Sequence, residues 1–150
     1  MAKCRILMHV RTLGLDVGSR TIGTAVTDEL GMCAHVLRTI LRRGTAIDVQ
    51  AVQALARQYQ TEHVVVGVPY EQDGSLGRRG TRVMVFVDAL VAGGLRVELL
   101  DEGFSTVEAR ETLLSADLSR ARRKQVIDSV AAQVILQRWL DGQPHLDPAT

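Results

Sequence analysis

The sequence predicts an α/β fold: a mixed five-stranded sheet flanked by helices, in the element order β-β-β-α-β-α-β-α-α. Two observations carry this prediction. The first 40 residues contain strand-like segments separated by short turns, as in an antiparallel meander. Beyond them, segments with apolar residues at helical spacing alternate with short apolar runs. A meander followed by αβ crossovers gives a mixed sheet with helices on its faces.

The expected meander occupies the first 40 residues. Residues 12–17 (TLGLDV) form an apolar strand, and the Gly-Ser-Arg stretch at 18–20 predicts a tight turn. Residues 21–28 (TIGTAVTD) alternate small or apolar with polar side chains, which favours the second arm of a hairpin. Gly31 ends that arm, and residues 33–40 are expected to form the third strand.

The expected crossovers follow. Residues 63–68 (HVVVGV) are continuously apolar, as in a central strand covered on both faces, and Pro69 ends them. The expected elements are a helix at 45–60, the strand at 63–68, a polar loop at 70–79, a helix at 82–91, a strand at 95–100, a helix from 105 to about 116, and a last helix at 120–140.

Length and composition predict a single domain over residues 1–150, because 46% apolar and 23% charged residues are ordinary for one globular core. An N-terminal extension is expected at residues 1–10 and a flexible tail at 143–150. No apolar run predicts a signal peptide or a membrane span, so a cytoplasmic protein without a membrane partner is expected. Cys4 and Cys33 are far apart, which favours reduced thiols.

The balance of charge and aromatic content limits the kind of nucleic-acid surface that the chain can offer. A net charge of +1 provides no global positive field, so any such partner must be held by local patches. Aromatic residues make up only 3%, which argues against stacking of bases on exposed rings. Arg20, Arg79 and Arg123 are the candidates for phosphate contacts. The alternative is that they are solvated residues of turns and helix ends.

Three carboxylates stand where a purely structural role is hard to assign. Asp16 lies between Leu15 and Val17 in the most apolar strand, where an ionised carboxylate is costly unless it is paired or binds a metal. The alternative is a turn-forming Asp that accepts hydrogen bonds from the following backbone.

Asp128 is followed at helical spacing by Ala131, Ala132 and Ile135, so it is expected to face the protein body. An ion pair with Lys124 is the alternative.

Glu102 follows the last predicted strand, beside Asp101, at the sheet edge where ligand sites collect. Two solvated acids in a loop are the alternative. Taken together, three oxygen ligands from different elements suit Mg²⁺ or Mn²⁺. Two such ions would activate a water for phosphodiester hydrolysis. The four histidines are scattered and, with the two cysteines, indicate no zinc site.

Four motifs, spread over about residues 12–140, resemble the YqgF family, also called RuvX, which belongs to the RNase H-like superfamily. They are Gly14-Leu15-Asp16-Val17-Gly18-Ser19-Arg20-Thr21-Ile22-Gly23, then Val65-Val66-Gly67-Val68-Pro69 with Asp73-Gly74-Ser75, then Asp101-Glu102 with Ser105-Thr106-Val107-Glu108-Ala109, and Ile127-Asp128-Ser129-Val130-Ala131-Ala132 with Ile135-Leu136-Gln137.

The resemblance implies an RNase H-like fold whose acidic residues fall on Asp16, Glu102 and Asp128, as catalytic and metal-binding residues. It implies a nuclease in the maturation of the 5′ end of pre-16S rRNA, hence in ribosome biogenesis, acting as a monomer or homodimer on structured RNA. A Holliday-junction-type resolvase of branched DNA is an alternative that rests on fold-level analogy.

Two departures from the family pattern affect the expected activity. Gly103 stands where the family usually has an arginine after Asp-Glu, and Tyr70-Glu71 replace its Leu-Asn. Either Arg20 or Arg79 substitutes for the missing guanidinium, or its loss favours a second hypothesis, a non-catalytic nucleic-acid-binding module. Glu71 adds an acid near the end of the strand at 63–68, where it would either enlarge the metal site or repel substrate. A third hypothesis, a nucleotide-binding module like the actin-like ATPases, is disfavoured because those proteins need two such domains and 150 residues supply one.

Overall fold

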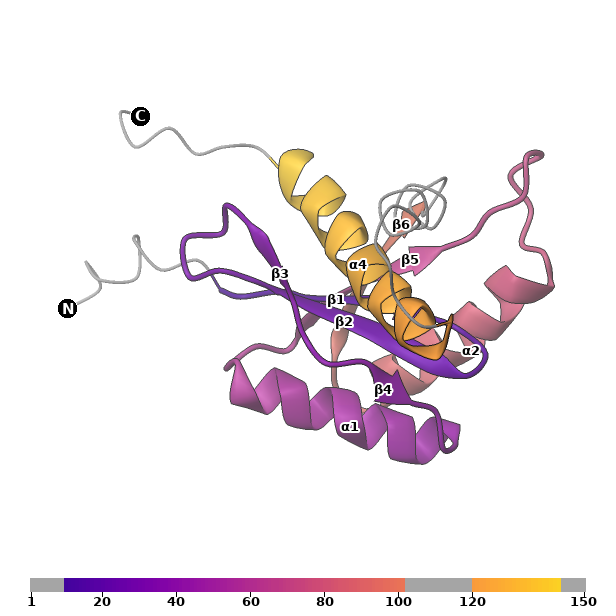
Figure 1. Cartoon of the computed structure of the whole chain (residues 1–150), viewed down its shortest axis with the longest axis horizontal. Helices are drawn as coiled ribbons and strands as arrows, with labels where there is room; N and C mark the ends of the chain where they lie inside the picture. Colours follow the sequence, from indigo (N-terminus) through magenta and orange to yellow (C-terminus); the bar gives the residue numbers. More distant parts are fainter. Residues whose placement is uncertain (1–9, 102–119, 144–150) are drawn as a thin grey trace.

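A computed structural model describes residues 10–101 and 120–143 of the chain. Within these ranges the protein has a mixed six-stranded sheet in the order β3-β2-β1-β5-β6, with β4 also paired to β2 (Figure 1). The elements are β1 (Leu13–Val17), β2 (Thr21–Thr27), β3 (Ala34–Val36), β4 (Ile40–Leu41), α1 (Thr45–Gln58), β5 (His63–Val68), α2 (Arg78–Ala92), β6 (Arg96–Asp101) and α4 (Arg120–Asp141).

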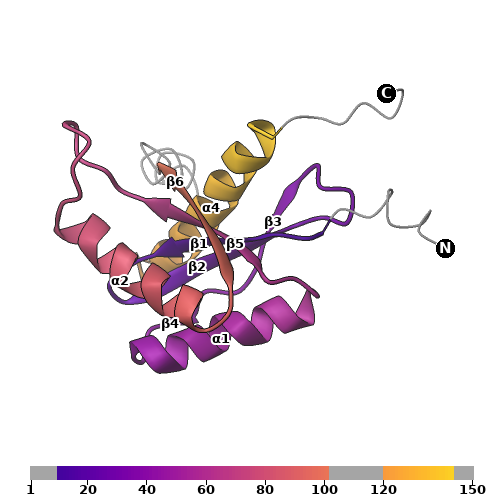
Figure 2. The same ribbon diagram turned by 180° about the vertical axis from the view of Figure 1, so that it is seen from behind.

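Helices cover both faces of the sheet. Helix α4 lies across one face, while α1 and α2 lie on the other (Figures 1 and 2). Side chains of β1 alternate between the two: Leu13 and Leu15 are fully buried in the core that α1 and α2 close. The smaller core under α4 contains Val65 of β5 and Leu136 of the helix. No helix in the described part of the chain has the length and apolarity needed to cross a membrane.

The strand pairing confirms the predicted mixed sheet. β1 and β2 form the antiparallel hairpin, with Leu15 opposite Thr24, and β1 pairs in parallel with β5, with Leu15 beside Val66. β5 pairs in parallel with β6 from His63 to Val68. β-branched residues dominate β5, since they pack well in a strand that is buried on both faces.

The third predicted strand, residues 33–40, is broken in the structure, which raises the strand count from five to six. β3 and β4 both pair with β2, and the Leu37 amide still donates to the Thr24 carbonyl, but residues 38 and 39 leave the ladder. There the Thr24 hydroxyl donates to the Arg38 carbonyl, so a side chain takes the place of a backbone partner. The Thr39 hydroxyl instead lies 2.5 Å from the Ser129 hydroxyl of α4. The alternation of apolar and polar residues in the sequence does not show where side-chain hydrogen bonds replace backbone pairing.

Helix α2 begins at Arg78, four residues before the predicted start at residue 82. Gly77 is its N-cap and accepts hydrogen bonds from the Thr81 amide at 2.9 Å and the Thr81 hydroxyl at 3.0 Å. The polar first turn hid this start, because Arg78 and Arg79 do not extend the apolar stripe. The helix predicted at 105–116 lies outside the described residues.

Helix α4 approaches β1 very closely at Gly14. A Cβ atom on Gly14 would lie 2.7 Å from the Leu136 Cβ and 3.1 Å from the Ala132 carbonyl oxygen. Both neighbours belong to the helix backbone or are attached directly to it, so they cannot rotate away. The absence of a side chain at position 14 therefore determines how near the helix lies to the sheet.

A row of polar side chains on α4 determines the direction of the helix. Gln137 accepts from the Ala34 amide at 2.9 Å, and Gln133 donates to the Ala34 carbonyl at 2.9 Å. Ser129, two turns before Gln137, contacts Thr39. Ala34 pairs with Thr27, which is hydrogen-bonded to Thr12 just before β1 begins. Thr39 precedes Ile40, and Ile40 pairs with Ile22 opposite the end of β1. Helix α4 therefore runs antiparallel to β1, and its earlier turns lie at the carboxyl end of that strand.

Replacing Gly14 by Ala is expected to lower the free energy of unfolding by about 1–3 kcal/mol, as overpacking does in a close-packed interior. Urea unfolding measures the change. Gly142→Ala is the matched control, because a Cβ there would meet only ordinary contacts at 3.6 Å. Equal stability changes for the two variants would contradict the close contact at Gly14.

Candidate active site

The carboxyl ends of three parallel strands meet at one edge of the sheet. Leu15 pairs with Val66, which brings the end of β1 level with the end of β5, and Val68 pairs with Asp101 at the end of β6. The turn after β1, the loop after β5 and the residue after Asp101 all leave the sheet here. In open α/β sheets this edge is where ligands bind.

Asp16 lies at this edge, on the face that α4 covers. Its neighbours Leu15 and Val17 belong to the opposite core, and Gly14, two residues earlier, contacts α4. Asp16 is partly exposed. Its cross-strand partner is Gly23, and Gly67 follows Val66 on the other side. Neither glycine contributes a side chain beside the Asp16 carboxylate.

The antiparallel course of α4 brings position 128 to the same edge. Ala132 contacts Gly14, and residue 128 lies one helical turn earlier, in the direction in which β1 proceeds from Gly14 to Asp16. One turn of helix advances about 5.4 Å, close to the rise of two strand residues. The side chain of Asp128 and the whole of Glu102 lie outside the description. Among the residues that are described, no three acidic, histidine or cysteine side chains gather as a metal site.

The predicted phosphate-binding arginines flank this edge where the structure describes them. Arg20 is exposed in the turn that follows β1, and Arg79 is exposed in the first turn of α2. Arg123 lies in the first turn of α4, but its side chain is not described. The structure therefore brings two of the three arginines to the end of the sheet that carries Asp16.

A buried ion pair beneath the turn at 18–20 was not predicted from the sequence. Asp48 of α1 is only 1% exposed, and its Oδ2 accepts from the Arg42 Nε–H at 3.1 Å. Arg42 also donates from Nη1 to the Gly18 carbonyl at 3.0 Å. The only signal in the sequence was an acid in the first turn of a helix, five and six residues after two arginines.

The loop after β5 extends away from the sheet and is closed by its own hydrogen bonds (Figure 1). Tyr70 and Leu76 form a bridge, and Gly74 has the positive φ of 84° that a turn favours in glycine. Asp73 accepts from the Ser75 hydroxyl at 2.6 Å and from the Ser75 amide at 3.0 Å. The Asp-Gly-Ser motif therefore has a structural use here, as a turn.

Glu71, the acid that departs from the family pattern, is directed back against its own loop. A Cβ on Gly77 would fall 2.1 Å from the Glu71 Oε1, so the carboxylate occupies the space beside the N-cap of α2. The amino end of a helix favours a negative charge. This contact gives Glu71 a structural role in the loop.

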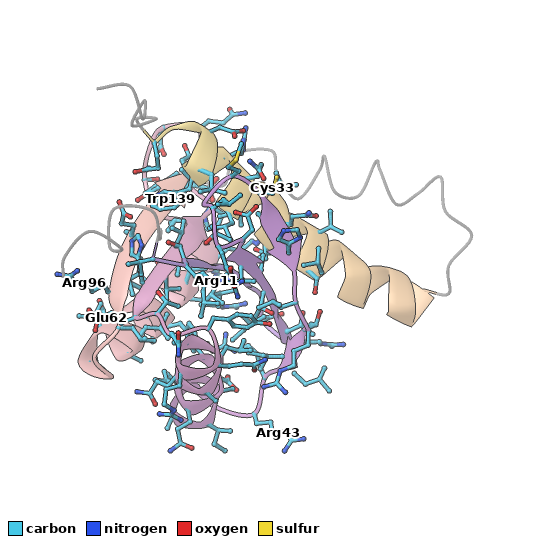
Figure 3. All side chains as sticks on the ribbon, turned by 90° about the vertical axis from the view of Figure 1, so that its left-hand side faces the viewer. Arg11, Cys33, Arg43, Glu62, Arg96 and Trp139 are labelled. Atoms are coloured by element: carbon cyan, nitrogen blue, oxygen red, sulfur yellow. The ribbon has the colours of Figure 1, made fainter. Side chains whose placement is uncertain are left out.

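His63, expected to have no role in a metal site, lies at the opposite edge, where β5 begins. Its Nε2 is 2.6 Å from Glu98 and its Nδ1 is 3.1 Å from the Thr12 hydroxyl. A shallow hollow of about 420 Å³ lies here, lined by Val10, Glu62, His63, Arg96, Val97 and Glu98. Figure 3 shows Glu62 and Arg96 close together on this side. The hollow lies away from the carboxyl ends of the strands and from Asp16.

Comparison with known proteins places the chain in a family. The family model described as "RuvX: Holliday junction resolvase" matches residues 10–142. The chain belongs to the RuvX family. A relative from Myxococcus xanthus, named "Putative pre-16S rRNA nuclease", is 49% identical over 142 residues, covering 94% of this chain and 93% of the relative. A relative of the same name from Moorella thermoacetica is 50% identical over 133 residues, covering 88% and 95%.

Two solved structures with the same fold were determined with Holliday junctions. The chain aligns with Thermus thermophilus RuvC, solved with a Holliday junction substrate, at a TM-score of 0.51 and 15% identity, covering 88% of this chain and 94% of that one. The fowlpox virus resolvase, solved with Holliday junction DNA, gives a TM-score of 0.53 at 9% identity, covering 87% and 97%. The predicted RNase H-like fold and the resemblance to RuvX are both confirmed.

Replacing Ser75 by Ala is expected to raise the pKa of Asp73 toward its ordinary value. The Ser75 hydroxyl is the largest cause of the lowered pKa of Asp73, followed by the Ser75 amide, since both donate to the charged form. The pKa of Asp28 is lowered chiefly by the Met32 amide and provides an internal control. Carboxyl ¹³C NMR titration measures both. An unchanged pKa of Asp73 would contradict the described turn.

Proposed function

We propose that this RuvX-family protein is a divalent-metal-dependent nuclease that acts in the maturation of the 5′ end of pre-16S rRNA, in the cytoplasm. One observation carries the proposal: Asp16 lies on the α4 face at the carboxyl edge of the sheet, and position 128 of α4 lies one turn before the contact with Gly14. Glu102 directly follows Asp101, which ends β6 at the same edge.

The chemistry of the proposed donor set fits Mg²⁺ or Mn²⁺. Asp16, Glu102 and Asp128 supply carboxylate oxygens only, which is the ligand type that these hard cations prefer. A bound ion supplies charge to the reacting phosphate and lowers the pKa of a water. Within the chain, Asp16 on the rigid central strand provides the fixed ligand, and Glu102 and Asp128 complete the set from separate elements.

The remaining polar groups bind and orient the substrate in this proposal. Arg20 and Arg79 are exposed on two sides of the edge, where guanidinium groups can hold phosphates on either side of the scissile bond. Such contacts determine where the backbone lies and carry no sequence information. Arg123, in the first turn of α4, is the third proposed contact. Structured RNA is the proposed substrate, as the names of the relatives suggest.

A second candidate function is supported by Gly103. The family's arginine at this place directly follows the proposed ligand Glu102 in the sequence, and this chain has glycine there. A protein that binds structured RNA without cleaving it accounts for that loss. Cleavage assays decide between the two, with an RNA carrying the pre-16S 5′ leader, an unrelated RNA hairpin and a DNA four-way junction, each with Mg²⁺, Mn²⁺ or EDTA. Preference for the DNA junction would favour a resolvase instead.

Replacing Asp16 by Asn is expected to lower the rate of Mn²⁺-dependent cleavage by at least about 100-fold, the upper end of the loss for residues that only support a metal ligand. The melting temperature should change little, because Asn has the same shape and Asp16 is partly exposed. Asp88→Asn, an exposed carboxylate on α2, is the matched control and should cleave like the wild type. Cleavage retained by Asp16→Asn would refute the metal site.

Replacing Arg20 or Arg79 by Ala is expected to weaken RNA binding and to lower the salt slope of log K by about one phosphate contact each. Binding is measured with a fluorescently labelled RNA hairpin in EDTA at several salt concentrations. Arg57→Ala is the control, because Arg57 lies in the last turn of α1, near the beginning of β5 and so at the other edge. Equal slopes in all three variants would contradict the proposed contacts.

A further inference from the structure

We infer that Arg42 and Asp48 form a positioning pair that holds the turn at residues 18–20, so that Arg20 is presented beside the strand end that carries Asp16. The inference rests on the proposed function, since it takes Arg20 as a phosphate contact. Arg42 itself is assigned no contact with substrate. The pair acts through the backbone of the turn, and each bond in this connection joins residues that the structure describes.

Asp48 is the buried end of the connection. Its carboxylate accepts from the Arg42 Nε–H through Oδ2 and from the Arg43 backbone amide through Oδ1, at 3.1 and 3.0 Å. Both oxygens of a side chain that is 1% exposed thus have donors, and one donor is charged. A buried carboxylate is tolerated only when it is paired in this way. Asp48 lies in the first turn of α1, so its position follows that of the helix.

Arg42 carries the connection to the turn. Its side chain is 19% exposed, and its guanidinium lies over the Phe86 ring, 5.2 Å from the centroid. While Nε–H faces Asp48, Nη1–H donates to the Gly18 carbonyl at 3.0 Å. The Arg42 backbone amide donates to the Arg20 carbonyl at 2.9 Å. One residue therefore holds both ends of the turn.

The turn itself is tight and leaves little freedom for Arg20. The Gly18 amide donates to the Thr21 carbonyl at 2.8 Å, and a Cβ on Gly18 would lie 3.0 Å from that oxygen. Because Gly18 is two residues after Asp16, a shift of the turn would also displace the end of β1. Since the carbonyls of Gly18 and Arg20 are both bound by Arg42, the backbone that carries the Arg20 side chain is fixed relative to the sheet.

Neighbouring arginines differ in burial and therefore in role. Arg43 is exposed and points away from the body of the protein (Figure 3), and it contributes only its backbone amide to Asp48. Arg42 is held inside by an ion pair, a carbonyl and an aromatic ring. Arg43→Lys thus alters an arginine beside the pair without altering the pair, which makes it a matched control.

Arg42→Lys tests the inference because lysine keeps the charge but cannot donate from a planar fork to Asp48 and Gly18 together. We expect faster amide hydrogen exchange at Gly18 and roughly 3- to 10-fold weaker binding of the labelled RNA hairpin in EDTA, within the range of coupling in one hydrogen-bonded network. In an Arg20→Ala background, Arg42→Lys should weaken binding no further. A purely structural role of Arg42 would weaken binding equally in both backgrounds.

The control and a second variant separate the outcomes. Arg43→Lys should leave Gly18 exchange and RNA binding as in the wild type. Asp48→Asn keeps the shape of the side chain and should have the same effects as Arg42→Lys. It replaces Arg42→Lys in the test if that variant folds poorly. Equal loss of binding with and without Arg20, or unchanged binding by both variants, would overturn the inference. A wild-type protein that binds neither RNA nor DNA junction would refute the proposed function, and unchanged Gly18 exchange would refute the hold on the turn separately.

Discussion

The contact between α4 and Gly14 of β1 is the constraint on which the arrangement of the edge depends. A side chain at position 14 would meet the Leu136 Cβ at 2.7 Å, so the helix can lie this close only over glycine. That contact determines the distance of α4 from the sheet. The hydrogen bonds of Ser129, Gln133 and Gln137 determine its position along the strands. Two independent sets of contacts therefore bring position 128 to the strand end that carries Asp16. A small change in either set of contacts would separate positions 16 and 128, which are 112 residues apart in the sequence.

The strand and helix positions were largely predictable because alternation and helical spacing report burial on one face. Asp16 could be singled out for the same reason, as an acid inside an apolar run. The break of the third strand could not, since it depends on the Thr24 hydroxyl and on Ser129 from the last helix. Arg42 and Asp48 were missed because a pattern of charges does not show which arginine is buried: Arg42 and Arg43 are adjacent and alike in sequence, yet only Arg42 faces an aromatic ring.

The two connections that leave the sheet at this edge are stabilised in different ways. Asp16 stands on a central strand paired on both sides, which fixes a carboxylate better than a loop can. The turn after β1 is held by Arg42, whereas the loop after β5 extends outward and is stabilised by its own Asp73–Ser75 contacts. In the proposed function, a nucleic acid at this edge would contact a turn held by Arg42 and a loop that is held by its own hydrogen bonds and packs beside the N-cap of α2. Such contacts suit substrates whose shape, more than their sequence, determines the fit.

The polar row of α4 also has a consequence for association between molecules. β3 is the last strand on its side of the sheet, and an edge strand with free backbone groups can pair with a strand from another chain. At Ala34 the amide donates to Gln137 and the carbonyl accepts from Gln133, in addition to the pairing of Ala34 with Thr27. The two glutamines therefore occupy backbone groups that would otherwise recruit a foreign strand. The residues that align the helix therefore also make this part of the edge less available for pairing with another chain.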